Sequence, residues 1–102
     1  MPLFTLALRF PASDDRRPRV RSRHREYLDE LKDEGKLVAA GLWGHDHGAL
    51  IVYQAQDADE ARKLLDNDPY ATEGVVADAE LHEWQPVVGN ASPLNKRVRD
   101  TS

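Results

Sequence analysis

The sequence contains no cysteine, and this absence removes several classes of function at once. Without thiols there can be no disulfide, no cysteine nucleophile and no thiolate ligand for a zinc ion. Cysteine usage therefore gives no indication of the redox compartment in which the protein works.

Long apolar runs and an excess of basic charge are also missing. Arg9 and Pro11 interrupt the apolar start of the chain before it reaches the length of a signal-peptide core, and no later run approaches membrane-spanning length. The formal net charge of −4 disfavours nucleic acid as a partner, because phosphate binding needs a basic face. We therefore predict a cytoplasmic protein with no membrane partner and no nucleic-acid partner.

The length of 102 residues corresponds to one domain with a modest core. Extended and helical patterns continue as far as residue 88, which predicts a domain over 1–88. From Gly89 onward the chain has neither periodicity nor apolar bulk, so 89–102 is predicted to be a C-terminal tail that is loose or straps a partner subunit.

Hydrophobic periodicity predicts four strands and two helices. Alternation predicts strands over 3–10, 36–43, 49–54 and 75–88, and helical spacing predicts helices over 18–34 and 57–67 with a short helical turn over 69–73. Gly35 is expected to end the first helix, and Asp57 with Glu60 forms a capping box at the start of the second. The order strand, helix, strand, strand, helix, strand predicts an α+β fold of the ferredoxin-like βαββαβ type, with a four-stranded antiparallel sheet.

The first strand is largely apolar on both faces, since Leu3 and Ala7 alternate with Phe4, Leu6 and Leu8. Two helices on one face of the sheet leave the other face uncovered. A second copy of the chain would cover it most economically, which predicts a homodimer whose two sheets form a dimeric α+β barrel.

His24 and Asp68 are the residues with the strongest functional interpretation. His24 falls on the apolar stripe of the first helix with Val20 and Leu28, so its imidazole should point inward. Asp68 falls on the inward stripe of the second helix and stands before Pro69, so its carboxylate should be held at a turn facing the sheet. If they meet, the pair forms an oriented general base, because a carboxylate fixes the tautomer of the imidazole.

Each residue taken alone also has a structural interpretation. An Asp before Pro is a common helix start, and it serves as an N-cap whether or not it has another role. A single His on an apolar helix face is often a hydrogen-bonded core residue. Only the combination of His24 with Asp68 favours chemistry.

Small residues at 39–41 leave room beside the second predicted strand, so a pocket could lie there. Tyr27, Trp43 and Tyr70 are the aromatic candidates for lining an apolar substrate pocket, although for each one taken alone a place in the core is the more common role.

A metal site is a further possibility at His45-Asp46-His47, since imidazoles two residues apart on an extended segment can point the same way. His24 or His82 would have to supply a third ligand. A polar turn flanked by glycine needs no metal to explain it, so we expect no metal and no cofactor.

Six arginines between positions 16 and 25 make the start of the first helix basic. Spread around a helix that turns acidic further on, they are predicted to form a solvated and salt-bridged face. Their positive charge opposes the helix macrodipole, a small cost that an anionic substrate could relieve.

Several of these elements together resemble the YciI-like (YCII-related) family. The resemblance covers about residues 3 to 88 and rests on His24 with Tyr27-Leu28, the stretch 33–37, Ala40-Gly41, Asp68-Pro69-Tyr70-Ala71, the stretch 74–76 and the stretch 82–84. It implies a dimeric ferredoxin-like fold and an active site formed by a paired His and Asp, here His24 and Asp68. The few members with a known reaction are dehydrochlorinase-type enzymes that act on small aromatic substrates.

Two hypotheses from different classes follow. In the first, the protein is a small-molecule enzyme of lyase or isomerase type, or with dehydrochlorinase-like chemistry, in which His24 moves a proton and Asp68 orients it. In the second, it is a non-catalytic metabolite-binding or regulatory dimer in which the two side chains are a buried polar pair. A cleft that opens beside His24 would favour the enzyme, and a sealed pair would favour the structural role.

Overall fold

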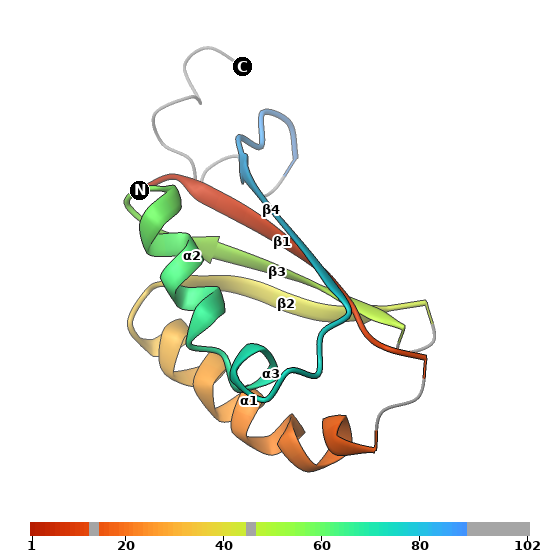
Figure 1. The fold of residues 1–102 in the computed structure, drawn as a ribbon. Coiled ribbons are helices and arrows are strands. Elements are labelled where there is room, and N and C mark those ends of the chain that lie inside the picture. Colours follow the sequence, from red (N-terminus) through yellow and green to blue (C-terminus); the bar gives the residue numbers. More distant parts are fainter. Residues whose placement is uncertain (13–14, 45–46, 90–102) are drawn as a thin grey trace.

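The computed structural model describes residues 1–12, 15–44 and 47–89. The elements along the chain are β1 (Leu3–Arg9), α1 (Arg16–Asp33), β2 (Leu37–Trp43), β3 (Gly48–Gln54), α2 (Ala58–Asp66), α3 (Pro69–Thr72) and β4 (Asp78–Trp84). The strands form one antiparallel sheet in the order β2-β3-β1-β4, and the helices lie on one of its faces (Figure 1). The predicted ferredoxin-like α+β fold is confirmed.

The ends of the helices lie within two residues of the predicted ends for local reasons. Gly35 adopts a φ of 77°, the left-handed conformation that ends α1 at little steric cost. The Asp57 carboxylate accepts a hydrogen bond from the backbone N–H of Glu60 at 2.8 Å, and the Glu60 carboxylate accepts one from the backbone N–H of Gln56 at 2.9 Å. These two bonds satisfy donors at the start of α2 that would otherwise lack a partner.

The last strand is shorter than the predicted 75–88. Val75 donates its backbone N–H to the Tyr70 carbonyl at the end of α3, and Ala77 donates to the Arg9 carbonyl at the end of β1. Val75 is also fully buried in the core. Residues 75–77 therefore link α3 to the sheet, and the strand pairing begins at Asp78.

The hydrophobic core lies between the sheet and the helices. On the covered face β1 contributes Phe4, Leu6 and Leu8, which pair with Tyr53, Ile51 and Ala49 of β3 in that order. The helix α1 adds the buried stripe Val20, His24, Leu28 and Leu31. One polar side chain, His24, therefore stands in an otherwise apolar helix stripe, as predicted.

The opposite surface of the sheet, here called the open face, carries the side chains of Thr5, Ala7, Trp43, Leu50, Val52, His82 and Trp84. Among these, Trp43 is 45% exposed and Leu50 and Trp84 are each 38% exposed. Gly48 lies beneath the Trp43 indole, and a Cβ at this position would collide with both the indole and the Leu8 carbonyl. Glycine at 48 thus leaves the space that the indole occupies.

None of the helices in the described residues is both long enough and apolar enough to cross a membrane. The predicted tail over 89–102 falls, apart from Gly89, outside the residues that the structure describes.

Candidate functional site

Asp68 lies at the junction of α2 and α3, where several hydrogen bonds fix its position. It is the N-cap of α3, and its Oδ1 accepts the backbone N–H of Tyr70 at 2.8 Å. Its own backbone N–H donates to the Leu65 carbonyl at 3.0 Å, and Pro69 begins α3 with a φ already suited to a helix. The side chain is 1% exposed, so the carboxylate is held in one buried position.

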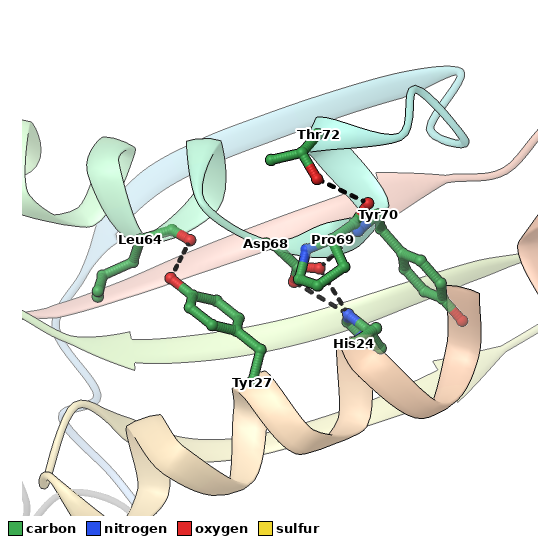
Figure 2. A network of polar contacts seen from close by, with 7 residues as sticks. All are labelled: His24, Tyr27, Leu64, Asp68, Pro69, Tyr70 and Thr72. Carbon is green, nitrogen blue, oxygen red and sulfur yellow. Dashed lines mark hydrogen bonds and ion pairs between the residues drawn. The ribbon is translucent and has the colours of Figure 1, made fainter.

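His24 reaches this carboxylate from the middle of α1. Its Nδ1 lies 2.8 Å from Oδ1 and 3.0 Å from Oδ2 of Asp68, although the two residues are 44 positions apart in the chain. Figure 2 shows the two side chains pointing toward each other from α1 and from the start of α3. The structure thus brings together the two residues for which the sequence predicted a pairing.

The position of Asp68 determines which nitrogen of His24 can act as a base. An ionised carboxylate only accepts hydrogen bonds, so Nδ1 must carry a hydrogen and donate it. In the neutral ring the lone pair is then on Nε2. Among the described residues, Nε2 makes no hydrogen bond. If it were fully buried, it would be a buried polar atom without a partner, but the only such side-chain atom among these residues is the Tyr53 hydroxyl. Nε2 is therefore accessible to solvent and to a ligand.

Tyr70 fixes the plane of the imidazole. The two rings stack with centroids 3.8 Å apart and an interplanar angle of 8°. Phe10 contacts the Tyr70 ring edge-on with centroids 5.5 Å apart, and the guanidinium of Arg17 lies over Phe10 at 4.2 Å. The imidazole is held both by a hydrogen bond in its plane and by an aromatic ring against its face.

Tyr27 connects the site to α2. Its hydroxyl donates to the Leu64 carbonyl at 2.6 Å, which ties α1 to the last turn of α2 just before Asp68 (Figure 2). Burial, reinforced by the negative charges of Asp68, Glu34 and Glu30, raises the pKa of Tyr27 to about 12. Its hydroxyl therefore remains a hydrogen-bond donor throughout the neutral range.

Tyr53 lies deeper in the core. Burial, followed by the negative charge of Asp68 and by Tyr27 when it ionises, raises the pKa of Tyr53 far above its ordinary value. Its hydroxyl has no hydrogen-bond partner among the described residues. Tyr53 thus stays neutral and does not compete with His24 for the carboxylate.

A cavity of about 160 Å³ opens beside His24, between α1 and the sheet. It is lined by Arg21, His24, Arg25 and Leu28 of α1, by Ala40, Gly41 and Leu42 of β2, by Ala49 and Ile51 of β3, and by Tyr70. The predicted room beside the small residues of β2 is confirmed at Ala40 and Gly41. The pair is therefore not sealed, because one side of the imidazole faces a hollow.

The three aromatic candidates have separate positions. Tyr70 lines the cavity, whereas Tyr27 is engaged with the Leu64 carbonyl and does not line it. Trp43 does not line it either, because adjacent strand residues point to opposite faces and Trp43 lies on the open face while Leu42 lies beside the cavity. Alternation along β2 separates Leu42 from Trp43, but the sequence alone did not show which of the two faces the helices.

The arginines of α1 have more specific contacts than the predicted solvated face. Arg16 donates to the carbonyls of Glu73 and Gly74 at 3.2 and 3.3 Å, and Arg23 pairs with the Glu73 carboxylate at 3.9 Å. These contacts hold α3 against α1. Arg21 and Arg25 line the cavity, which sequence reasoning missed, although their placement four residues apart and on either side of His24 was a signal that could have indicated it.

The predicted metal alternative falls largely on residues that the structure does not describe. His45 and Asp46 lie outside the described residues. Among residues 1–12, 15–44 and 47–89, no group of three or more His, Asp or Glu side chains is arranged to hold a metal ion.

A comparison of the sequence with profiles of known families gives a match to one family. The profile of the YCII-related domain family matches residues 1–85, which is most of the chain. The chain belongs to the YCII-related domain family. A comparison of this YCII-related protein with curated proteins found no match.

Solved structures share the fold of this YCII-related protein. One is the 5-chloro-2-hydroxyhydroquinone dehydrochlorinase TftG from Burkholderia phenoliruptrix AC1100, in complex with 2,5-dihydroxybenzoquinone. It is 24% identical over 81% of this chain and 93% of its own, with a TM-score of 0.72. Muconolactone isomerase is 14% identical over 82% of this chain and 88% of its own, with a TM-score of 0.64. An uncharacterised NIPSNAP domain protein from Burkholderia xenovorans is 12% identical over 86% of this chain and 96% of its own, with a TM-score of 0.55.

Proposed function

We propose that this YCII-related protein is a small-molecule enzyme of lyase or isomerase type, in which His24 is the general base and Asp68 orients it. One observation carries the proposal: His24, whose Nδ1 is bound by a buried carboxylate, lines a cavity of about 160 Å³, and its Nε2 has no hydrogen-bond partner among the described residues. A purely structural pair would have no use for the hollow or for the open nitrogen.

The proposed chemistry begins with Nε2 removing a proton from a carbon atom next to a carbonyl group. The electron pair of the broken C–H bond passes into the carbonyl as an enolate, and His24 becomes an imidazolium that the Asp68 carboxylate stabilises. Return of the proton to another carbon completes an isomerisation. Loss of a leaving group such as chloride from the neighbouring carbon completes an elimination, and His24 then gives its proton to water. Neither route needs a cofactor.

The similarity to TftG and muconolactone isomerase supports this reaction class, because one is named as a dehydrochlorinase and the other as an isomerase. In this chain Tyr70 is the aromatic side chain that we propose contacts the substrate, since it lines the cavity. Tyr27 is a positioning residue, because it acts through the Leu64 carbonyl on the segment that carries Asp68.

The open face is the proposed dimer interface. Trp43, Leu50 and Trp84 expose apolar surface on it, and the helices of the described residues lie on the other face. A second copy would bring the same apolar residues against them in a twofold contact. The proposal gives a homodimer in which each chain keeps its own cavity beside α1.

The function can be tested by hydrogen–deuterium exchange at carbon. Proton NMR in D2O would follow the C–H signals of levulinate and its methyl ester, 2-oxobutanoate and its methyl ester, and the neutral α-angelica lactone. Wild-type protein should exchange at least one of these, and His24→Gln should lower the rate by about 10²–10⁴, the usual share of a general base. Gln retains a donor for Asp68, so the fold should persist.

Two outcomes would overturn the enzymatic proposal. One is exchange at equal rates by wild type and His24→Gln, and the other is no exchange above buffer with any compound of the panel. Ligand binding without exchange would instead support the alternative, a non-catalytic metabolite-binding or regulatory dimer.

A further inference from the structure

Two arginines lie at the cavity beside His24. Arg21 and Arg25 are one helical turn apart on α1, on either side of His24 in the sequence, and both line the cavity. Arg21 is half-buried there and Arg25 is exposed. Among the described residues, the other side chains that line the cavity, apart from His24, are apolar groups, glycine and Tyr70, and none of these is acidic.

Within α1 itself, the spacing of these two positive charges is unfavourable. Like charges four residues apart on a helix repel each other. The first turn of α1 carries no acidic residue, so the basic half of the helix also opposes the macrodipole. Asp29, one turn beyond Arg25, pairs with Lys32 at 3.6 Å, and no described residue makes a hydrogen bond or ion pair with Arg25. A bound anion would relieve the repulsion.

The cavity also limits the size of that anion. Its volume of about 160 Å³ is close to the engineered apolar cavity of about 150 Å³ that holds one benzene molecule. The apolar walls come from Leu28, Ile51 and the small residues of β2, and the stacked rings of Tyr70 and His24 form a flat boundary. A single ring or a short chain fits this space.

We infer that the substrate is a small organic anion, such as a carboxylate or an ionised enol, no larger than one substituted ring. Its charged group is held by Arg21 and Arg25 while its apolar part lies against Leu28 and Ile51. This inference rests on the proposed function and deepens it. The two guanidinium groups orient the anion so that a neighbouring C–H bond reaches Nε2 of His24, and their positive charge stabilises the enolate that forms.

Benzoate and benzamide are suitable probes, because they have nearly the same shape and differ in charge. Titration would be followed by calorimetry and by the NMR signals of the His24 ring. We expect benzoate to bind and to shift these signals, and benzamide to bind about tenfold or more weakly. Arg21→Gln and Arg25→Gln should each weaken benzoate binding several-fold, and the double variant should weaken it about tenfold or more without changing the affinity for benzamide.

Arg19→Gln is the matched control. Arg19 lies on the same helix, is exposed and does not line the cavity, so its replacement makes the same change in net charge. Benzoate affinity should change less than about twofold in this variant, because an exposed charge away from the site is screened by salt. An equal loss in Arg19→Gln and Arg21→Gln would mean that only overall charge matters, which would overturn the inference.

The remaining outcomes separate this inference from the proposed function. Equal binding of benzamide and benzoate, or no shift of the His24 signals with millimolar benzoate, would overturn the anion inference and leave the exchange test of His24 standing. Arginine-dependent binding of benzoate together with absent exchange would support anion binding and overturn the enzymatic proposal. In the exchange panel, the inference requires the acids to exchange faster than their methyl esters in the wild type.

Discussion

The two faces of the one sheet differ in how their apolar surface is covered. On the covered face, Leu6 of β1 lies under α1 and α2 in a continuous core. On the open face, the neighbouring Thr5 and Ala7 lie among Trp43, Leu50 and Trp84, which remain partly exposed. The helices of the described residues lie over the covered face, and the titratable pair His24 and Asp68 is on that face.

The difference shows why a polar site can exist inside so small a domain. A buried carboxylate needs hydrogen bonds to satisfy it and packing to hold it in place. The covered face supplies both, since the Tyr70 backbone N–H and the Tyr70 ring each contact the pair. No helix in the described part of the chain covers the open face, so Trp43, Leu50 and Trp84 leave apolar surface there for association.

The largest expected effect is on the covered face, in the variant Asp68→Ala. We expect a loss of about 3 kcal/mol in the free energy of unfolding, since an N-cap is worth about 1 kcal/mol and a hydrogen bond to a charged group about 1.5–3 kcal/mol. Urea denaturation at neutral pH would measure it.

The matched control is Asp57→Ala, which removes an exposed N-cap carboxylate that also accepts a backbone N–H, that of Glu60 at the start of α2. It should cost only about 1 kcal/mol. Asp68→Asn should fall between the two, because its amide oxygen still accepts from Tyr70. Equal losses in Asp57→Ala and Asp68→Ala would show that the buried pair adds no stability.

A second variant addresses the open face. Leu50→Lys should weaken the proposed dimer by at least about 2 kcal/mol, or roughly 30-fold in the dissociation constant, because it places a charge in the middle of an apolar contact. Sedimentation equilibrium would measure the association. The circular dichroism spectrum should not change, since Leu50 is already partly exposed in the single chain.

Ser22→Lys provides the control for Leu50→Lys, because it adds the same charge at an exposed position of α1. It should leave the association unchanged. A wild-type protein that stays monomeric at all accessible concentrations would contradict the dimer proposal, and so would equal weakening by both variants.

The smallest expected effect is on the free energy of unfolding when either of two tyrosines of the covered face loses its hydroxyl. Tyr27→Phe should cost about 1 kcal/mol of unfolding free energy, because it removes the hydrogen bond to the Leu64 carbonyl. Tyr53→Phe should be neutral or slightly stabilising, because it removes a buried hydroxyl that has no partner among the described residues. A larger loss in Tyr53→Phe than in Tyr27→Phe would contradict this assignment.

The contribution of Tyr27 should also depend on pH. Its pKa is raised from about 10 in the unfolded chain to about 12 in the folded chain, so folding favours the protonated hydroxyl. The stability difference between wild type and Tyr27→Phe should be complete below about pH 10 and should disappear as the pH rises toward about 12. Urea denaturation of both proteins at about pH 8 and about pH 11 would show the change.

Sequence reasoning was most accurate where structure depends on near neighbours. The inward position of His24 followed from the helical spacing of Val20 and Leu28, and the fixed position of Asp68 followed from capping before Pro69. The ferredoxin-like fold followed from the order of the elements. The prediction of the last strand was too long at both ends, since β4 runs from Asp78 to Trp84. At its start, a hydrogen bond from Val75 back to α3 overrides the extended propensity.

The sequence by itself determined the elements, the two apolar faces of β1 and the inward direction of the imidazole, because periodicity and capping act within a few residues. Only the tertiary structure decided that Nδ1 meets the carboxylate, that Tyr70 stacks on the ring and that Arg21 lines a cavity with Ile51. These contacts join segments far apart in the chain, and packing of α1 against α3 and the sheet sets their distances.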